Sequence, residues 1–201
     1  MIIKELISQK QHCYCLIDQN DDVWVIDKIV VQDKKLYQGQ IIDDNSFEEI
    51  YQYSEYTRAK NRGFYLLNSH RYSRGMLYYK LCQHFDESAC EKAVNRIEEL
   101  GFLDDDDYAR CLAKKYIEIK SFSSKRIVQE LIKKRIETSL AQEVAEELCN
   151  EVDTQSVICD LIERKYVESI DDEKKRNKAI MSLMRKGYYY NDIKQAYSLL
   201  E

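Results

Sequence analysis

The sequence predicts a mainly α-helical fold, with three tandem three-helix repeats forming an elongated curved solenoid behind a small β-rich N-terminal module. First, a pattern of apolar residues recurs about every fifty residues, and such a period is typical of helical solenoids. Second, the 201 residues contain no proline, a residue that is disfavoured inside helices. Third, the start of the chain alternates β-prone runs with polar clusters instead.

The β-rich module is predicted over residues 1–50. Its β-prone runs at 1–7, 13–18 and 23–27 are separated by polar turns, which is the pattern of a small antiparallel meander. A short helix near 46–50 is expected to lead into the repeats. The module holds five Lys or Arg against ten Asp or Glu, so it carries the whole net charge of −5.

The repeats are predicted over 51–102, 103–151 and 152–201, with nine helices from about residue 54 to the end. In the middle helix of each repeat, corresponding residues recur at helical spacing. Those residues are Ser73, Leu77 and Leu81; Ser123, Ile127 and Leu131; and Lys175, Ala179 and Leu183.

The last helix of each repeat has apolar residues three and four apart, which places them on one face. A bulky apolar residue, Phe85, Ile136 or Tyr188, precedes each of these helices. The corresponding buried positions are Cys90, Ala93 and Ile97; Ala141, Val144 and Leu148; and Ile193, Ala196 and Leu200. In the opening helices Ala59, Ala109 and Cys159 correspond, and the second repeat adds an apolar stripe of Tyr108, Cys111, Leu112, Tyr116 and Ile119.

The segment 101–107 is predicted to end one helix and to begin the next. Gly101, like Gly187, stands where a helix ends, a place that favours a left-handed residue. The acidic run from Asp104 to Asp107 suits the exposed N–H groups of a helix start. Consecutive helical residues point in different directions and the glycine of a calcium loop is missing, so we expect a helix cap and no metal site.

Residues for catalysis are not arranged in any recognisable motif. The seven cysteines have no disulfide-framework spacing, the three histidines lie near no nucleophile motif, and no glycine-rich phosphate loop is present. Cys13 and Cys15 beside His12 resemble half of a zinc site, but no second pair follows. We expect structural thiols, no catalytic residue, no metal and no cofactor. A metal or thiol enzyme built on these cysteines remains the weakest alternative.

The chain has no signal peptide and no apolar run near eighteen residues, so we expect a cytoplasmic protein without a membrane partner. Tyrosine is abundant, with sixteen residues, most of which are expected to fill helix interfaces. Tyr79 and Tyr189, which stand beside basic residues, are the candidates for stacking on bases or anchoring a protein interface.

Basic residues gather on or beside the middle helices, and the segment between Glu55 and Asp86 has no acidic residue. Equivalent helices of a solenoid line up, so these clusters predict a positive stripe that suits a polyanion backbone or an acidic protein surface. The alternative is ordinary solvated helix surfaces with local charge pairing. The candidate contact residues are Arg58, Arg62, Arg71, Arg74, Lys80, Lys125, Arg126, Lys133, Lys134, Lys174, Lys175, Arg176, Arg185 and Lys186.

Several segments together resemble one family. Gly-Phe-Leu-Asp-Asp at 101–105, followed by Tyr108-Ala109, is similar to the Gly-apolar-Leu-Asp-Asp motif of the RecX regulatory proteins. The family's glycine before the apolar turn residue is kept only as Gly187, and the first two repeats have His84 and Arg135 near that place. Supporting pieces are Arg71-Tyr72-Ser73 with Leu77 and Leu81, Arg126-Ile127 with Glu130-Leu131 and Lys134, and Leu183 with Arg185-Lys186-Gly187-Tyr188.

The resemblance covers essentially the whole chain and implies three tandem three-helix repeats. It also implies a protein that binds RecA filaments on single-stranded DNA and modulates recombination, DNA repair and the SOS response, usually by inhibiting RecA. We expect a monomer that meets the DNA through the filament. The second hypothesis is a helical-repeat protein that binds nucleic acid directly through its basic stripe.

Overall fold

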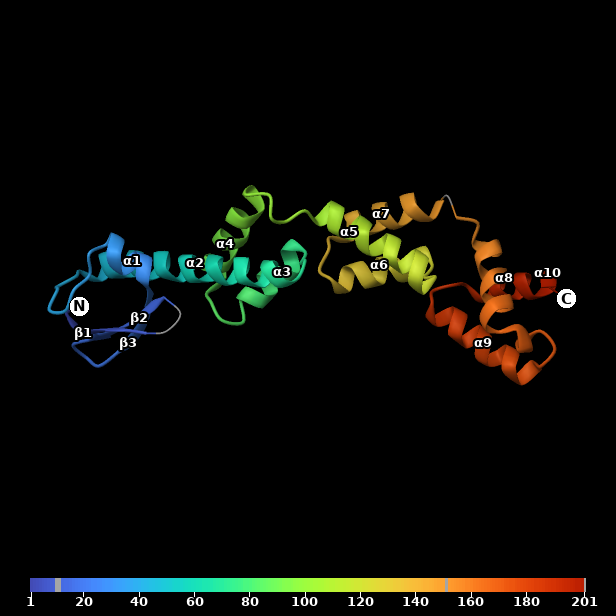
Figure 1. Cartoon of the computed structure of the whole chain (residues 1–201), viewed down its shortest axis with the longest axis horizontal. Helices are drawn as coiled ribbons and strands as arrows, with labels where there is room; N and C mark the ends of the chain where they lie inside the picture. Colours follow the sequence, from blue (N-terminus) through green and yellow to red (C-terminus); the bar gives the residue numbers. More distant parts are fainter. Residues whose placement is uncertain (10–11, 151, 201) are drawn as a thin grey trace. The chain divides into compact units, whose positions relative to one another are not determined.

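The computed structural model describes residues 1–9, 12–150 and 152–200. The chain forms two compact units, Met1–Leu103 and Asp104–Glu201 (Figure 1). The described residues contain one three-stranded sheet, close to the N-terminus, and ten α-helices. The predicted fold class, mainly helical with a small β-rich start, is therefore confirmed. The predicted repeat ends at residues 151 and 201 lie outside the described residues.

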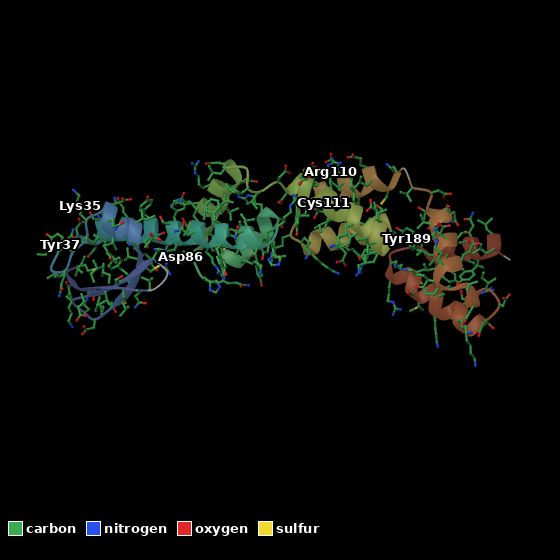
Figure 2. The ribbon with its side chains drawn as sticks, in the orientation of Figure 1. Lys35, Tyr37, Asp86, Arg110, Cys111 and Tyr189 are labelled. Carbon is green, nitrogen blue, oxygen red and sulfur yellow. The ribbon has the colours of Figure 1, made fainter. Side chains whose placement is uncertain are left out.

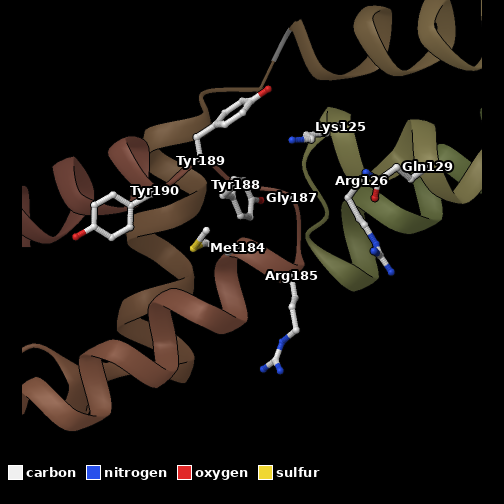
Figure 3. A pocket seen from close by; sticks show the side chains of 9 residues that line it. All are labelled: Lys125, Arg126, Gln129, Met184, Arg185, Gly187, Tyr188, Tyr189 and Tyr190. Atoms are coloured by element: carbon white, nitrogen blue, oxygen red, sulfur yellow. The ribbon is translucent and has the colours of Figure 1, made fainter.

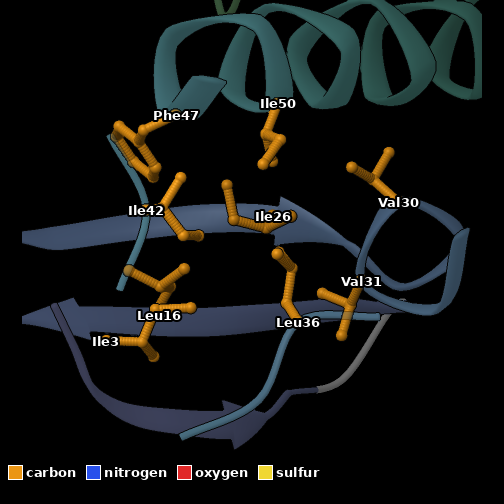
Figure 4. Close-up of a cluster of buried hydrophobic side chains, with 9 residues drawn as sticks. All are labelled: Ile3, Leu16, Ile26, Val30, Val31, Leu36, Ile42, Phe47 and Ile50. Carbon is orange, nitrogen blue, oxygen red and sulfur yellow. The ribbon is translucent and has the colours of Figure 1, made fainter. Parts of the chain in front are cut away.

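The sheet is the predicted antiparallel meander, with strand order β1-β2-β3. Its hydrophobic face is covered by the short helix α1 and by the first turns of α2, which contribute Phe47 and Ile50 to the core (Figure 4). Ile3, Leu16 and Ile26 supply the sheet side of that core and are fully buried. The elements are β1 (Ile3–Ser8), β2 (Cys13–Asp18), β3 (Val23–Asp27), α1 (Lys28–Asp33) and α2 (Asp44–Ser69).

Helix α2 corrects two sequence predictions. The separate short helix near 46–50 is wrong, because those residues are the first turns of a 26-residue helix that begins after its N-cap, Asp43. The Asp43 carboxylate accepts a hydrogen bond from the Ser46 N–H at 2.9 Å. The predicted boundary between 50 and 51 falls inside this helix. One end of α2 therefore packs on the sheet while its later turns, at Ala59, belong to the core of the first repeat.

The first repeat places α2, α3 (Arg74–Leu81) and α4 (Glu87–Glu99) around one core. Leu77 and Leu81 of the middle helix and Ile97 of the last helix are fully buried, as the spacing predicts. Gly63 allows α2 and α4 to approach closely, since a Cβ atom there would lie 2.5 Å from Ile97 Cδ1.

The second unit contains two further helical cores. The first is formed by α5 (Asp105–Lys115), a π-helical turn η1 (Tyr116–Lys120), α6 (Ser124–Lys133) and α7 (Thr138–Asn150). The second is formed by α8 (Thr154–Lys165), a 3-10 turn η2 (Val167–Ser169), α9 (Glu173–Arg185) and α10 (Tyr190–Leu200). Ile127, Leu131 and Leu183 belong to these cores and Ala179 is buried as well, which confirms the middle-helix pattern.

Two helix predictions in the second unit are wrong in detail. Cys111 and Ile119 do not belong to the buried stripe: Cys111 is exposed (Figure 2) and Ile119 lies in the π-helical turn with 60% of its surface exposed. Ala109 and Ala113 occupy the buried face instead. Lys175 is also no counterpart of the N-cap Ser123, because α9 begins earlier and is capped by Asp172.

The turn predictions depend on single residues. Asp104 is the N-cap of α5, and its carboxylate accepts from the Asp107 N–H at 2.9 Å, which confirms the capping role of the acidic run. Gly101 and Gly187 have φ values of +77° and +98°, as expected for helix ends. Arg135, which replaces glycine in the second repeat, also adopts a left-handed backbone with φ +57°.

Candidate functional site

A groove lies within the second unit, between the start of α6 and the turn that joins α9 to α10 (Figure 3). We call it the junction groove, and its volume is about 560 Å³. Three of its lining residues are cationic and four are apolar or aromatic, whereas none is acidic. The lining residues are Lys125, Arg126, Gln129, Met184, Arg185, Gly187, Tyr188, Tyr189 and Tyr190.

The groove exists because the turn after α9 docks onto the segment before α6. The Ser123 N–H donates a hydrogen bond to the Lys186 carbonyl at 3.0 Å. The Lys186 ammonium in turn donates to the Lys120 carbonyl. Gly187, the residue after Lys186, comes so close to α6 that an added Cβ atom would lie 2.8 Å from Arg126 Cβ. The second and third repeats are therefore joined by direct backbone contacts at this point.

Tyr188 anchors the same turn. Only 7% of its surface is exposed, and its hydroxyl donates to the Ser121 carbonyl at 3.1 Å. Burial raises the pKa of this phenol to about 12, so the hydroxyl remains a neutral donor at ordinary pH. Tyr188 thus supports the floor of the groove, while Tyr189, the next residue, faces outward.

Tyr189 and Lys125 form a cation–π pair across the junction. The Lys125 ammonium lies 5.1 Å from the centroid of the Tyr189 ring (Figure 3). Tyr189 is 61% exposed, and Lys125 is exposed as well. The pair therefore presents a positive charge beside an accessible aromatic face, which is chemistry suited to nucleic-acid phosphates and bases.

Arg126 and Lys186 are both engaged by other groups of the protein. The Arg126 guanidinium pairs with Glu130 at 2.8 Å, lies over the Phe122 ring, and extends away from Tyr189 (Figure 3). Its Nε atom is buried and makes no hydrogen bond within the part of the chain that the structure describes. Burial, followed by the charges of Lys165 and Lys120, lowers the pKa of Lys186. Lys186 therefore serves the junction more than the open groove.

The fourteen basic residues predicted from the sequence fall into three groups: those at the junction groove, those that hold their own unit together and those on exposed or partly exposed surfaces. Lys125, Arg126 and Arg185 line the junction groove, and Lys186 adjoins it. Arg185 is exposed and makes no ion pair with the described residues. Lys174 is equally exposed but lies at the opposite end of α9.

Three of the predicted arginines hold their own unit together. Arg58 pairs with Glu55 at 2.5 Å and donates to the Val25 carbonyl of β3. Arg74 at the start of α3 reaches two carboxylates of α4, at 2.5 and 3.1 Å. Arg176 donates to the carbonyls of Ser169 and Ile170, which end the η2 turn. These arginines therefore have protein partners that any external ligand would have to replace.

The remaining candidates occupy exposed or partly exposed helix faces. Lys133 and Lys175 pair with nearby glutamates, and exposed pairs of this kind are weak. Arg62 and Lys80 lie over tyrosine rings at 5.0 and 5.5 Å, respectively. Arg71 is exposed beyond the end of α2, and Lys134 is half-buried at the end of α6.

Within the second unit, the basic starts of the middle helices α6 and α9 do not lie together, although a positive stripe of equivalent helices would require it. The start of α6 meets the end of α9, so Lys125 lies with Arg185 and away from its sequence counterpart at the start of α9. Sequence reasoning selected Tyr189 but missed Gln129, Met184 and Tyr190. The run of three tyrosines after a basic helix end was the one signal for this place.

Groups for metal or thiol chemistry are not assembled among the described residues. No cluster of three or more His, Cys, Asp or Glu side chains there has the arrangement of a metal site. Burial raises the pKa of the Cys13 thiol, which disfavours its reactive thiolate form. No helix in the described chain is long and apolar enough to cross a membrane.

Comparison with known proteins gives one family throughout. Residues 151–197 match the model of the third three-helix domain of RecX. A regulatory protein RecX of Clostridioides difficile is 24% identical, and the match covers 99% of this chain and 95% of that protein. One from Finegoldia magna is 23% identical, with 80% of each chain covered.

Two solved structures share the fold. A crystal structure of regulatory protein RecX matches with a TM-score of 0.65 and 18% identity, covering 96% of this chain and 98% of the other. RecX from Lactobacillus salivarius matches with a TM-score of 0.62 and 22% identity, covering 73% of this chain and 96% of that one. The domain match, the relatives that extend over nearly the whole chain and the shared fold agree: this chain is similar to the RecX regulatory proteins over nearly its whole length.

Proposed function

We propose that this protein binds RecA filaments on single-stranded DNA and inhibits RecA's ATP hydrolysis and strand exchange during recombination and DNA repair. The junction groove carries this proposal. It brings together three cationic side chains and two exposed tyrosines, Tyr189 and Tyr190, from two packed helical repeats, and no acidic residue lines it. Similarity to regulatory proteins over nearly the whole chain supports a role in control. The proposed protein acts in the cytoplasm as a monomer and needs no cofactor.

The mechanism is binding without chemistry. Lys125 and Arg185 are held on separate helices, α6 and α9, and the docked turn fixes their relative positions. Cations held this way gain affinity for a polyanion because each neutralised phosphate releases its condensed counterions. A protein bound along the filament hinders the movement of RecA subunits and the access of a second DNA strand.

A second candidate function is direct binding of nucleic acid, with RecA incidental. The Lys125–Tyr189 pair favours it, since a cation beside an accessible ring suits free single strands as well as those inside a filament. The two candidates differ in their dependence on RecA. Direct binding also predicts a steep loss of affinity as the salt concentration rises.

The test is RecA's single-stranded-DNA-dependent ATP hydrolysis, measured with increasing amounts of this protein beside its affinity for bare DNA at the same salt. Filament regulation predicts suppression at substoichiometric amounts together with weak binding to bare DNA. Unchanged hydrolysis by the cognate RecA, with tight binding to bare DNA, would favour the second candidate instead.

A further inference from the structure

We propose that the junction groove holds a segment of unpaired polynucleotide, with one base stacked on Tyr189 and phosphates along the strand bound by Lys125 and Arg185. The inference rests on the proposed function, because the strand in question is the one that RecA coats. It adds the ligand of this groove, the residue that contacts a base and a preference for single strands over duplex.

The Tyr189 ring is accessible to a ligand. Lys125 lies over the ring at 5.1 Å, yet 61% of the Tyr189 surface is exposed, so ring surface remains open to a ligand. Tyr188 beside it is buried and hydrogen-bonded, which fixes the backbone from which Tyr189 projects. A held, exposed ring offers a stacking surface at a small cost in conformational entropy.

The cations of α6 stand at the start of that helix. Lys125 and Arg126 occupy the first turn of this helix, which contains no acidic residue. Positive side chains are unfavourable at the positive end of a helix dipole, whereas anions are stabilised there. The first turn of α5 shows the usual arrangement, with three aspartates. A phosphate bound at the start of α6 would therefore gain from both the cations and the helix dipole.

Arg185 supplies the groove with a cation from the third repeat. Arg185 lines the groove from the end of α9, is exposed and makes no ion pair with the described residues. It contrasts with Arg74 and Arg176, whose guanidinium groups are engaged by carboxylates or carbonyls of the protein. Lys125 lies beside the ring and Arg185 lines the groove from the other repeat, farther from Tyr189, which suits phosphates bound along a strand whose base stacks on the ring (Figure 3).

An exposed tyrosine ring favours single strands over duplex. A base in duplex DNA is stacked on both faces, so it reaches Tyr189 only if the duplex opens. An unpaired base reaches the ring directly, and stacking is tolerant of sequence because every base has an aromatic face. An acidic protein surface would contact the same cations but would not depend on bases.

The experiment measures binding of the full chain to a fluorescein-labelled oligo(dT) by anisotropy at low salt. The comparison ligands are a duplex of equal length and an abasic strand. The variants are Tyr189→Ala, Tyr189→Phe and Lys125→Gln. Tyr37→Ala is the matched control, because Tyr37 is 62% exposed and lies in the other unit (Figure 2).

We expect Tyr189→Ala to weaken oligo(dT) binding at least about fivefold, while Tyr189→Phe and Tyr37→Ala bind as the wild type does. For the abasic strand, the wild type and Tyr189→Ala should bind with the same affinity. Lys125→Gln should reduce the dependence of log affinity on log salt by about one.

Three results would overturn the inference: no oligo(dT) binding by the wild type, equal binding by Tyr189→Ala, or equal affinity for duplex. If Tyr189→Ala weakens filament binding but not oligo(dT) binding, the groove contacts protein, and the proposed function stands without the inference. If the Tyr189 effect on oligo(dT) holds while RecA's ATP hydrolysis is unchanged by the wild type, the groove assignment stands and the proposed function fails.

Discussion

Replacing Gly187 with alanine tests whether the turn after α9 is docked on the start of α6. Gly187 has φ +98°, a backbone conformation that costs an L-residue about 1–2 kcal/mol. The added Cβ atom would overlap Ser123 Oγ and would lie 2.8 Å from Arg126 Cβ and 3.0 Å from Arg126 N. Alanine at this position therefore meets both backbone strain and a steric clash.

The steric part of the cost cannot be relieved cheaply. The Ser123 hydroxyl can rotate away only by giving up its capping bond to the Arg126 N–H, worth about 1 kcal/mol. The Arg126 nitrogen is backbone and moves only with α6. Overpacking of this kind typically costs about 1–3 kcal/mol, so we expect Gly187→Ala to destabilise the second unit by about 2–5 kcal/mol in all.

Gly101→Ala is the control, because Gly101 has φ +77° but no atom lies within 4 Å of its added Cβ. It should cost about 1–2 kcal/mol from the backbone alone. Denaturant unfolding followed by circular dichroism gives both free energies. Hydrogen exchange of the Ser123 amide, which donates to the Lys186 carbonyl, reports the junction directly. Equal destabilisation by the two variants, with Ser123 exchange unchanged, would refute the docking.

Three further outcomes are expected. Gly63→Ala should lower the free energy of unfolding of the first unit by about 1–3 kcal/mol in denaturant titrations, because its Cβ would meet Ile97 Cδ1. Ile97→Val removes that atom, so the double variant should be more stable than the sum of the two single effects predicts. Tyr188 has a pKa of about 12 in the folded protein and an ordinary value of 10, so the unfolded chain loses this proton first and stability falls as pH rises from 10 to 12. In pH-dependent unfolding, Tyr188→Phe should therefore show a shallower fall in stability over this range. Arg74→Ala should reduce stability by about 1 kcal/mol through its lost bonds to α4, while leaving oligo(dT) affinity unchanged; a large loss of affinity without a loss of stability would contradict its structural role.

Much of the fold was predictable, because periodicity reports burial directly. β-prone runs separated by polar clusters predicted the three strands, and the spacing of residues such as Leu77 and Leu131 predicted the helical cores. The errors arise where tertiary packing decides. Nothing local shows that α2 continues from the sheet into the first repeat, or that a π-helical turn displaces Ile119 from the buried face.

The site was only partly predictable. Lys125 and Tyr189 are each suggested by their neighbours, but they belong to different repeats and meet only because the Gly187 turn docks before α6. Charge counting could not separate Arg185, which is exposed, from Arg74, which is held by carboxylates, because both stand in basic segments. That distinction depends on which acidic side chains the fold brings within reach.

The most direct measurement is the affinity of this protein for preassembled RecA filaments on single-stranded DNA, compared between the wild type, Lys125→Glu and the control Lys92→Glu. Lys92 is an exposed lysine in the middle of α4, outside the junction groove. Filament regulation through the groove predicts tight binding by the wild type and by Lys92→Glu, and at least about tenfold weaker binding by Lys125→Glu. Absence of filament binding by the wild type, or equal binding by all three proteins, would contradict it.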